Sequence, residues 1–188
     1  MSRIKMGILC LMLISPVARA GDIYKIDPEH TFASFEYVHW GLSLQRGRFD
    51  RVSGGIELDV PAKTGSINMD IDVGSVSTGI GLFNNVLRSD SFFDAASYPK
   101  ITFKSTGMQF DGDNLIQVNG DLTIKAATRP VTFEITHFEC HFMLLYLKRA
   151  CGANGFTKIL RSDYGMGRYA PFVSDEVTLY FSVEAIKE

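Results

Sequence analysis

Residues 118–135 read VNGDLTIKAATRPVTFEI, two runs of alternating apolar and polar residues around the turn-like stretch Ala126 to Pro130. Alternation with a period of two places apolar side chains on one face of a β-strand and polar side chains on the other. A strand with one apolar and one polar face is typical of an antiparallel sheet that has water on one side. The segment therefore predicts two strands of an antiparallel sheet.

The same alternation recurs along most of the chain. The runs cover residues 33–39, 56–60, 67–73, 101–104, 118–124, 131–136 and 177–183, with a further candidate at 156–161. Turn-forming residues separate several runs, as at 61–65 and 111–114. About eight strands joined by short turns predict an all-β fold, either an up-and-down barrel or a sandwich. No internal repeat or linker divides the chain.

One stretch breaks the strand pattern. Between Gly79 and Phe93, apolar residues recur at helical spacing, and they are Leu82, Phe83, Val86 and Leu87. Ser77 or Thr78 could cap this helix. A single helix with one apolar face has to pack on the sheet or over one end of a barrel, because that face must be buried.

The N-terminus has the features of a secretory signal peptide. A short basic segment, Ser2 to Lys5, precedes an apolar run from Met6 to Val17, and Ala18-Arg19-Ala20 is an A-x-A cleavage signal. The apolar run is too short to span a bilayer. We therefore expect residues 1–20 to be a signal peptide cleaved after Ala20, residues 21–188 to form one domain, and the protein to be periplasmic if its source is a Gram-negative bacterium.

The charge of the mature chain argues against a nucleic-acid partner. Arg3, Lys5 and Arg19 leave with the signal peptide, so 16 basic residues remain against 21 acidic ones, a formal charge of −5. Proteins that bind nucleic acids carry a basic patch, which this composition does not favour. The sequence predicts an exported soluble protein.

Two cysteines remain after cleavage, Cys140 and Cys151. An even pair in an oxidising compartment usually forms a disulfide, and the C-x-x-C spacing of a redox-active pair is absent. The bond would close a loop of 12 residues, and its loop entropy predicts a stabilisation of about 3 kcal/mol. The enclosed segment, His141 to Ala150, shows no strand alternation and is interpreted as a long hairpin loop fixed at its base.

Metal and catalytic motifs are missing. His137, Cys140 and His141 are close in sequence, but their neighbours favour a strand, Cys140 is assigned to the disulfide, and no H-E-x-x-H is present. No G-x-S-x-G elbow, P-loop or dinucleotide fingerprint occurs. The sequence predicts no metal site, no catalytic residue and no cofactor.

The apolar face of the strands carries large side chains, namely Phe35, Tyr37, Phe103, Leu122 and Phe133. A barrel of about eight strands is either filled by such side chains or holds one small ligand. The pattern leaves both interpretations open, a filled core and a tunnel for a long apolar ligand. The candidate ligand-binding set is completed by Leu42, Leu87 and Phe92.

Two polar residues could orient the head group of such a ligand. His39 interrupts an apolar face, where it could donate a hydrogen bond to a ligand or be a satisfied core histidine. Arg88 could bind a phosphate or carboxylate, or form a local ion pair with Asp90.

In these motifs the chain resembles the YceI-like proteins. The resemblance rests on four groups of residues in order: His30-Thr31-Phe32, His39-Trp40-Gly41 and Gly47-Arg48-Phe49; LRSDSFFD at 87–94 with Tyr98-Pro99 and Thr102-Phe103; GDLTI at 120–124 with TRPVT at 128–132; and CGA at 151–153, RSDYGM at 161–166 and VSDEV at 173–177. It covers residues 22–186. Two positions depart from the family pattern: Ala126-Ala127 stand where a glycine is frequent, and Trp40 is bulky enough to narrow a cavity mouth.

The resemblance implies a lipocalin-like antiparallel β-barrel with a long hydrophobic cavity for polyisoprenoids or other long-chain lipids, a periplasmic or secreted location, and no established catalysis. It favours the tunnel over the filled core. We therefore expect an exported carrier of a polyprenyl phosphate or isoprenoid quinone. The alternatives are an enzyme acting on such a lipid and a quinone-binding accessory to electron transfer. The expected partners are the lipid and, transiently, a membrane or membrane protein, and the chain could be a monomer or a homodimer.

Overall fold

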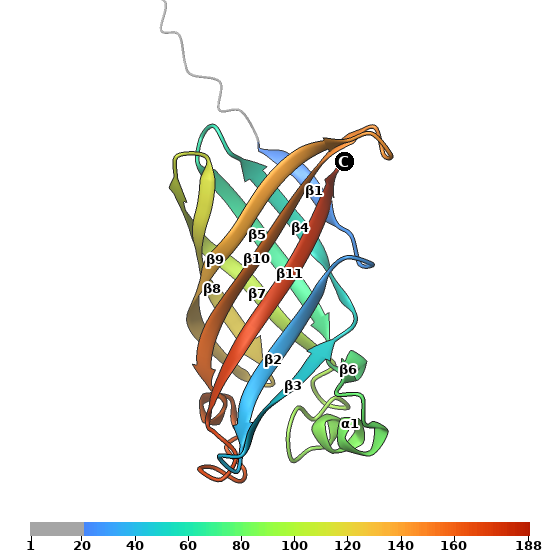
Figure 1. Ribbon diagram of the computed structural model, residues 1–188, viewed down its shortest axis with the longest axis vertical. Helices are drawn as coiled ribbons and strands as arrows, with labels where there is room; N and C mark the ends of the chain where they lie inside the picture. The colour runs from blue at the N-terminus through green and yellow to red at the C-terminus, as the bar shows by residue number, and fades with distance from the viewer. Residues whose placement is uncertain (1–20) are drawn as a thin grey trace, which may run out of the picture.

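Eleven β-strands and one short α-helix make up most of the chain in the computed structural model, which describes residues 21–188 (Figure 1). The strands are β1 (Asp22–Ile26), β2 (Phe32–His39), β3 (Ser43–Phe49), β4 (Val52–Asp59), β5 (Thr64–Asp72), β6 (Val76–Ser77), β7 (Lys100–Asp111), β8 (Asn114–Ile124), β9 (Ala127–Met143), β10 (Lys148–Leu160) and β11 (Glu176–Lys187). The helix is α1 (Gly81–Arg88), and the two 3₁₀ turns are η1 (Val73–Ser75) and η2 (Arg161–Tyr164). The predicted signal peptide and its cleavage site lie outside the described residues.

The sheet closes on itself. Strands β1, β4, β5, β7, β8, β9, β10 and β11 pair in that order, all antiparallel, and β1 returns to pair with β11. Strand β11 is long enough to pair twice along one edge, with β1 through Ala185–Lys187 and with β2 through Thr178–Ser182. Strands β2, β3 and β6 continue the wall below this point (Figure 1). The expected lipocalin-like antiparallel barrel with eight strands in the ring is confirmed.

The hairpin predicted from residues 118–135 is present, but its turn is shorter than expected. Strands β8 and β9 pair from Ile124 opposite Ala127, so the turn consists of Lys125 and Ala126 alone. Thr128 to Pro130 belong to β9, with Pro130 opposite Asp121. Lys125 has a φ of 55°, a left-handed conformation that favours glycine, so the turn forms here although no glycine is present.

Three strands lie outside the predicted runs, namely β1, β3 and the two-residue β6. β3 carries Gln45 and Gly47 at positions that face the barrel interior, and the apolar signal that marks an inward strand face is therefore weak. β1 has only five residues, too few for a clear alternation.

The predicted helix exists but is shorter than residues 79–93. It spans Gly81–Arg88, and the chain then folds back through backbone hydrogen bonds such as Ala95 N to Arg88 O. Neither Ser77 nor Thr78 is the N-cap, which is Ile80 without a side-chain bond. The Thr78 hydroxyl instead lies 2.7 Å from Asn84 Oδ1. Within residues 21–188, no helix is long and apolar enough to cross a membrane.

The barrel has two distinct ends (Figure 1). The helix end carries α1, the β2–β3 turn and the segment 165–175 between η2 and β11. The hairpin end carries the β9–β10 turn and the C-terminus. A compact cluster of Tyr24, Leu58, Cys151 and Ala185, each less than a tenth exposed, packs inside the barrel towards the hairpin end.

Candidate ligand-binding cavity

A cavity of about 660 Å³ occupies the barrel interior. Its wall is almost entirely apolar and extends from Tyr24 and Ala185 at one end to His39 and Tyr169 at the other. An eight-stranded barrel has room for one small ligand when its inward side chains leave the centre free. The interior of this barrel is therefore a lined cavity and not a completely filled core.

Most of the predicted ligand-binding residues share this wall. Those that line the cavity are Phe35, Tyr37, His39, Leu87, Phe92, Phe103, Leu122 and Phe133. They come from strands β2, β7, β8 and β9 and from α1 and the segment that follows it. Their contact with a ligand remains a prediction.

Leu42 and Arg88 do not line the cavity. Leu42 lies on the β2–β3 turn with 84% of its side chain exposed, because the chain leaves the inward face of β2 at Trp40 and Gly41, both with positive φ. Arg88 follows the inward Leu87 on α1, and successive helical residues point about 100° apart. Its Nε is buried without a hydrogen-bond partner, and no ion pair with Asp90 occurs among the described residues.

Glycines in the barrel wall leave space in which phenylalanine rings of neighbouring strands lie against the wall. Phe35 lies opposite Gly47 on the neighbouring strand, and a Cβ added to Gly47 would lie 2.3 Å from the ring. An added Cβ on Gly120 would lie 2.4 Å from the ring of Phe103. Because each ring occupies the space above a glycine, it lies against the wall and leaves the centre of the barrel open.

The mouth of the cavity is at the helix end. Solvent-exposed residues of the lining gather there, including His39, Trp40, Arg168 and Tyr169. The Trp40 ring stacks on Phe172 with 4.8 Å between centroids, and Trp40 N donates to Phe172 O. The lining at the opposite end consists of the buried cluster around Tyr24, so a ligand has access from the helix end.

Arg161 is a functional candidate that the sequence analysis missed. Its side chain is 7% exposed and lines the cavity. The guanidinium donates to the carbonyl oxygens of Met166, Arg168, Val173 and Ser174, and thereby holds the mouth segment 165–175 in place. Strand alternation could have indicated an inward position for Arg161, because it continues the alternate positions of Thr157 and Ile159, and all three residues are buried.

The charge of Arg161 is not neutralised by a hydrogen-bonded carboxylate, because its acceptors are carbonyl groups. Burial lowers its pKa, while Asp175 and Tyr37 act in the opposite direction. Among the described residues, the cavity lining includes Arg161 and Arg168 but no aspartate, glutamate or lysine. The charged part of the lining is therefore cationic.

Tyr164 and Gly165 lie where η2 ends and the mouth segment 165–175 begins. Gly165 follows η2 with a φ of 71°, a left-handed conformation that glycine adopts without steric cost. Tyr164 is 2% exposed, and its hydroxyl has no hydrogen-bond partner among the described residues. Burial raises the pKa of Tyr164 to about 12, because the ionised phenolate would lose its hydration.

The predicted disulfide between Cys140 and Cys151 is present. The two residues lie directly opposite each other on β9 and β10. The predicted long loop is wrong, since pairing continues to Met143 opposite Lys148 and leaves four residues, 144–147, between the strands. His141 lies on this outer part of β9, 3.7 Å from Glu139.

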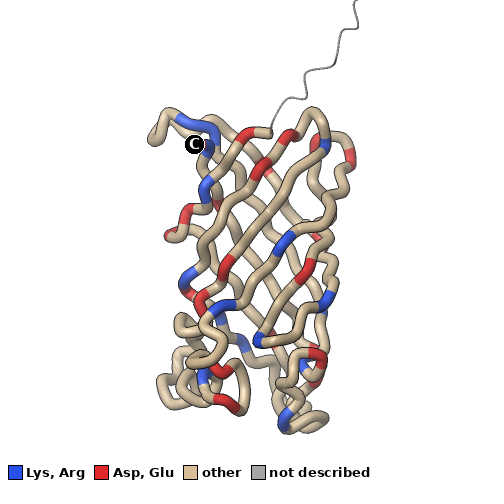
Figure 2. The backbone as a smooth tube through the Cα atoms, turned by 180° about the vertical axis from the view of Figure 1, so that it is seen from behind, with Lys and Arg blue, Asp and Glu red and all other residues tan. Residues whose placement is uncertain are grey.

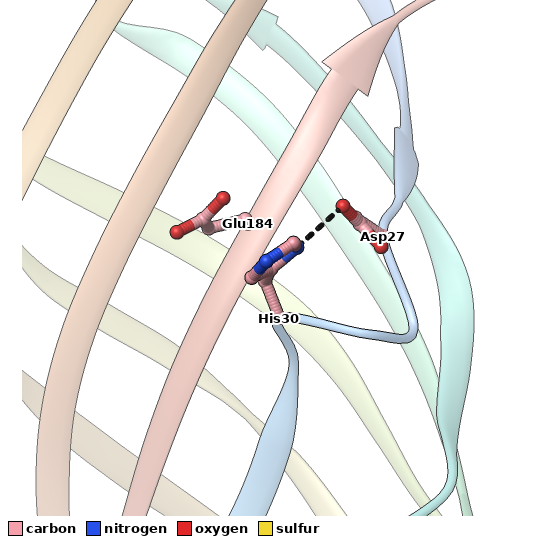
Figure 3. Close-up of side chains that lie close together, drawn as sticks. All are labelled: Asp27, His30 and Glu184. Atoms are coloured by element: carbon pink, nitrogen blue, oxygen red, sulfur yellow. Dashed lines mark hydrogen bonds and ion pairs between the residues drawn. The ribbon is translucent and has the colours of Figure 1, made fainter.

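A separate polar cluster lies where β1 and β2 diverge along β11. Figure 3 shows His30 beside Asp27, with a dashed line for the 2.9 Å contact between Nδ1 and Oδ2, and Glu184 nearby. The side-chain atoms of these three residues that could coordinate a metal ion lie within 4.8 Å of one another. None of the three residues lines the cavity. The hydrogen bond raises the pKa of His30 and lowers that of Asp27. The cluster stabilises a turn on the outside of the barrel.

Comparison with known proteins places this barrel in a family. The model of the YceI-like domain matches residues 24–185. Protein YceI of Escherichia coli O17:K52:H18 is 36% identical over 182 residues, which cover 95% of this chain and 93% of the relative.

Two solved structures share the architecture. The crystal structure of Burkholderia cenocepacia BcnA superposes with a TM-score of 0.72 at 27% identity and covers 85% of this chain and 98% of its own. A polyisoprenoid binding domain from Saccharophagus degradans has a TM-score of 0.67 at 20% identity, with 88% and 98% covered, and shows the common fold. By sequence and by architecture, the chain belongs to the YceI-like family.

Proposed function

We propose that this protein is an exported carrier that binds a polyisoprenoid with a phosphate head group. The observation that carries the proposal is the 660 Å³ apolar cavity with a cationic mouth. Burial of a long hydrocarbon tail gains about 25 cal/mol per Å² of apolar surface removed from water. This gain provides affinity without catalysis, which agrees with a family of binding proteins.

The cavity volume sets the length of tail that fits. At roughly 30 Å³ per non-hydrogen atom, the share that a water molecule has in the liquid, 660 Å³ holds on the order of 20 atoms. That number corresponds to about four isoprene units. The related fold from Saccharophagus degradans is described as a polyisoprenoid binding domain, which supports a tail of this chemical class.

The charge of the mouth favours a phosphate over a quinone. Arg168 is exposed at the mouth, and the Arg161 guanidinium is buried beside it without a hydrogen-bonded carboxylate. A phosphate gains charge-assisted hydrogen bonds from arginine that a neutral quinone head cannot match. His39 lies at the same mouth and would contact the head group.

Export is supported by the N-terminal sequence pattern and by the disulfide. Ala18-Arg19-Ala20 follows an apolar run, and Cys140 is bonded to Cys151. Disulfides persist in oxidising compartments, so a periplasmic location agrees with both observations.

Mass spectrometry of the mature protein from its native compartment tests the proposal first. The intact complex is weighed and then extracted with organic solvent. We expect a stoichiometric isoprenoid phosphate. A quinone would shift the assignment to the electron-transfer alternative, and a protein that is empty and takes up no lipid afterwards would exclude a carrier.

Two matched pairs of variants test the cavity and the mouth separately. Leu122→Trp fills the cavity and should abolish uptake of geranylgeranyl phosphate, whereas Ile116→Trp on the outer face of the same strand should not. Arg168→Gln should reduce the preference for geranylgeranyl phosphate over geranylgeraniol, whereas Arg129→Gln, which makes the same change in charge at a residue that does not line the cavity, should have a smaller effect. Equal effects within either pair would contradict the assigned position.

A further inference from the structure

The β9–β10 turn carries an exposed apolar surface that neither the cavity nor the barrel core uses. We call residues 142–147, FMLLYL, the hairpin tip. Its leucines Leu144, Leu145 and Leu147 are 79%, 81% and 74% exposed, and Phe142 is 62% exposed. None of the six residues lines the cavity or belongs to a core cluster.

Such a tip has no explanation in the folding of the hairpin. Turns normally carry glycine, asparagine or aspartate, and Leu147 here adopts a φ of 51° that leucine rarely takes. Runs of exposed apolar residues lower solubility unless they serve an interaction. The hairpin tip is therefore a candidate interaction surface that a binding partner covers in the functional state.

The charges next to the hairpin tip indicate the chemistry of its binding partner. Lys148 and Arg149 directly follow the tip, and residues 140–151 contain no acidic residue. Figure 2 shows this basic segment at the hairpin end. Residues 21–188 as a whole carry 16 basic and 21 acidic residues, so the hairpin is locally opposite in sign to the rest of the chain. Apolar side chains flanked by lysine and arginine suit the interface of an anionic bilayer.

The base of the hairpin is rigid. Cys140 and Cys151 are bonded across the strands, and pairing continues to Met143 opposite Lys148. Tyr146 N donates to Met143 O within the turn. Because the hairpin is ordered before it meets a partner, little conformational entropy is lost on docking.

We propose that the hairpin tip inserts into the surface of an anionic lipid bilayer. Phe142 and the three leucines enter the interfacial region, while Lys148 and Arg149 contact the lipid head groups. The cavity mouth lies at the opposite end of the barrel and faces away from this membrane (Figure 1). The docking does not depend on which ligand the cavity holds.

The test measures binding of the mature protein to vesicles of equal parts phosphatidylethanolamine and phosphatidylglycerol. Replacing Leu144, Leu145 and Leu147 together by serine should weaken partitioning by about tenfold or more, because apolar burial drives interfacial insertion. Ile80→Ser with Leu82→Ser is the matched control, since these residues are 62% and 78% exposed at the helix end. The control variant should bind vesicles as the wild type does.

A second measurement locates the tip directly. Trp40 is the single tryptophan, so Tyr146→Trp in a Trp40→Phe background places one reporter on the tip. Its emission should shift to the blue on addition of vesicles and be quenched by brominated acyl chains. Lys148→Gln with Arg149→Gln should remove most of the salt dependence of binding.

Three results would overturn the proposal. Equal vesicle binding by the serine variant and the wild type would exclude the tip. Loss of binding in the control variant alone would assign docking to the mouth. A dimer that the serine variant abolishes, without any vesicle binding, would make a second copy of the chain the partner. A cooperative urea transition shows that each variant is folded, and uptake of geranylgeranyl phosphate, measured separately, distinguishes a failed docking surface from a failed carrier.

Discussion

Gly47→Ala tests whether a glycine in the wall keeps the cavity open. The added Cβ would lie 2.3 Å from Phe35 Cζ and 2.9 Å from the two adjacent ring atoms. Carbon atoms in contact are about 3.5–4.0 Å apart, so the ring has to move by about 1.2 Å or more. The paired strands β2 and β3 block movement of the Phe35 ring towards the wall, so the ring can move only into the cavity. The variant should therefore lose cavity volume while the barrel remains closed.

The expected loss of affinity follows from the tail length that no longer fits. Displacing one or two methylene groups costs about 0.8 kcal/mol each, which weakens binding roughly four- to fifteenfold. The cost in stability should be about 1 kcal/mol, the low end for overpacking, because the ring has space to enter. Titration of delipidated protein with geranylgeranyl phosphate, followed by the fluorescence of Trp40 in the cavity lining, measures the first quantity. Urea unfolding measures the second.

The control is Gly107→Ala, where an added Cβ meets nothing within 4 Å. In the double variant Gly47→Ala with Phe35→Leu, the smaller side chain should restore most of the affinity, since the two residues are in contact and their effects are coupled. If Gly47→Ala binds the lipid as tightly as Gly107→Ala, the rings do not set the size of the cavity, and our account of the wall is wrong.

Three further outcomes follow from the other sites. Replacing Cys140 and Cys151 by serine should reduce the free energy of unfolding by about 3 kcal/mol, measured in urea against the oxidised wild type. Burial raises the pKa of Tyr164 from 10.0 to about 12, so its contribution to stability is complete below pH 10.0 and is lost as the pH rises through the folded value. In the variant Tyr164→Phe, the free energy of unfolding measured in urea should fall less steeply with pH in the alkaline range. The pKa of His30 is raised by its pairing with Asp27, so this pairing stabilises the fold fully below pH 6.5 and loses its effect as the pH rises through the folded value of His30. The pKa of Asp27 is lowered, so the contribution of Asp27 is present above pH 3.8 and is lost as the pH falls through its folded value. Asp27→Asn should lower the His30 pKa measured by NMR, and an unchanged pKa would refute the contact.

The alternation of apolar and polar residues predicted much of the barrel because most strands have one face in water. Phe103 and Phe133 were recognised as inward residues for this reason, and both line the cavity. The same rule failed for β3, where Gln45 and Gly47 face the interior. An inward glycine carries no hydropathy signal, although it makes room for a ring on the next strand.

The residues at the mouth were harder to predict. Leu42 is among the predicted ligand-binding residues, but the turn at Trp40 and Gly41 carries it into solvent. Arg161 was overlooked, since a charged residue at the end of a strand usually faces water. Its role depends on the path of segment 165–175, which has no periodicity, and on carbonyl groups that every residue possesses.

The double pairing of β11 has a consequence for the order in which the chain acquires structure. Its neighbours β1 and β2 come from the N-terminal part of the domain, whereas β11 is the last strand. The ring therefore cannot close until the final residues are available, and these contacts of long sequence separation predict slow folding. Until then β1, β2 and β10 present unpaired edges that can recruit other chains. If the chain is exported unfolded, as we propose, the barrel is completed only on the far side of the membrane, after residues 176–187 have crossed.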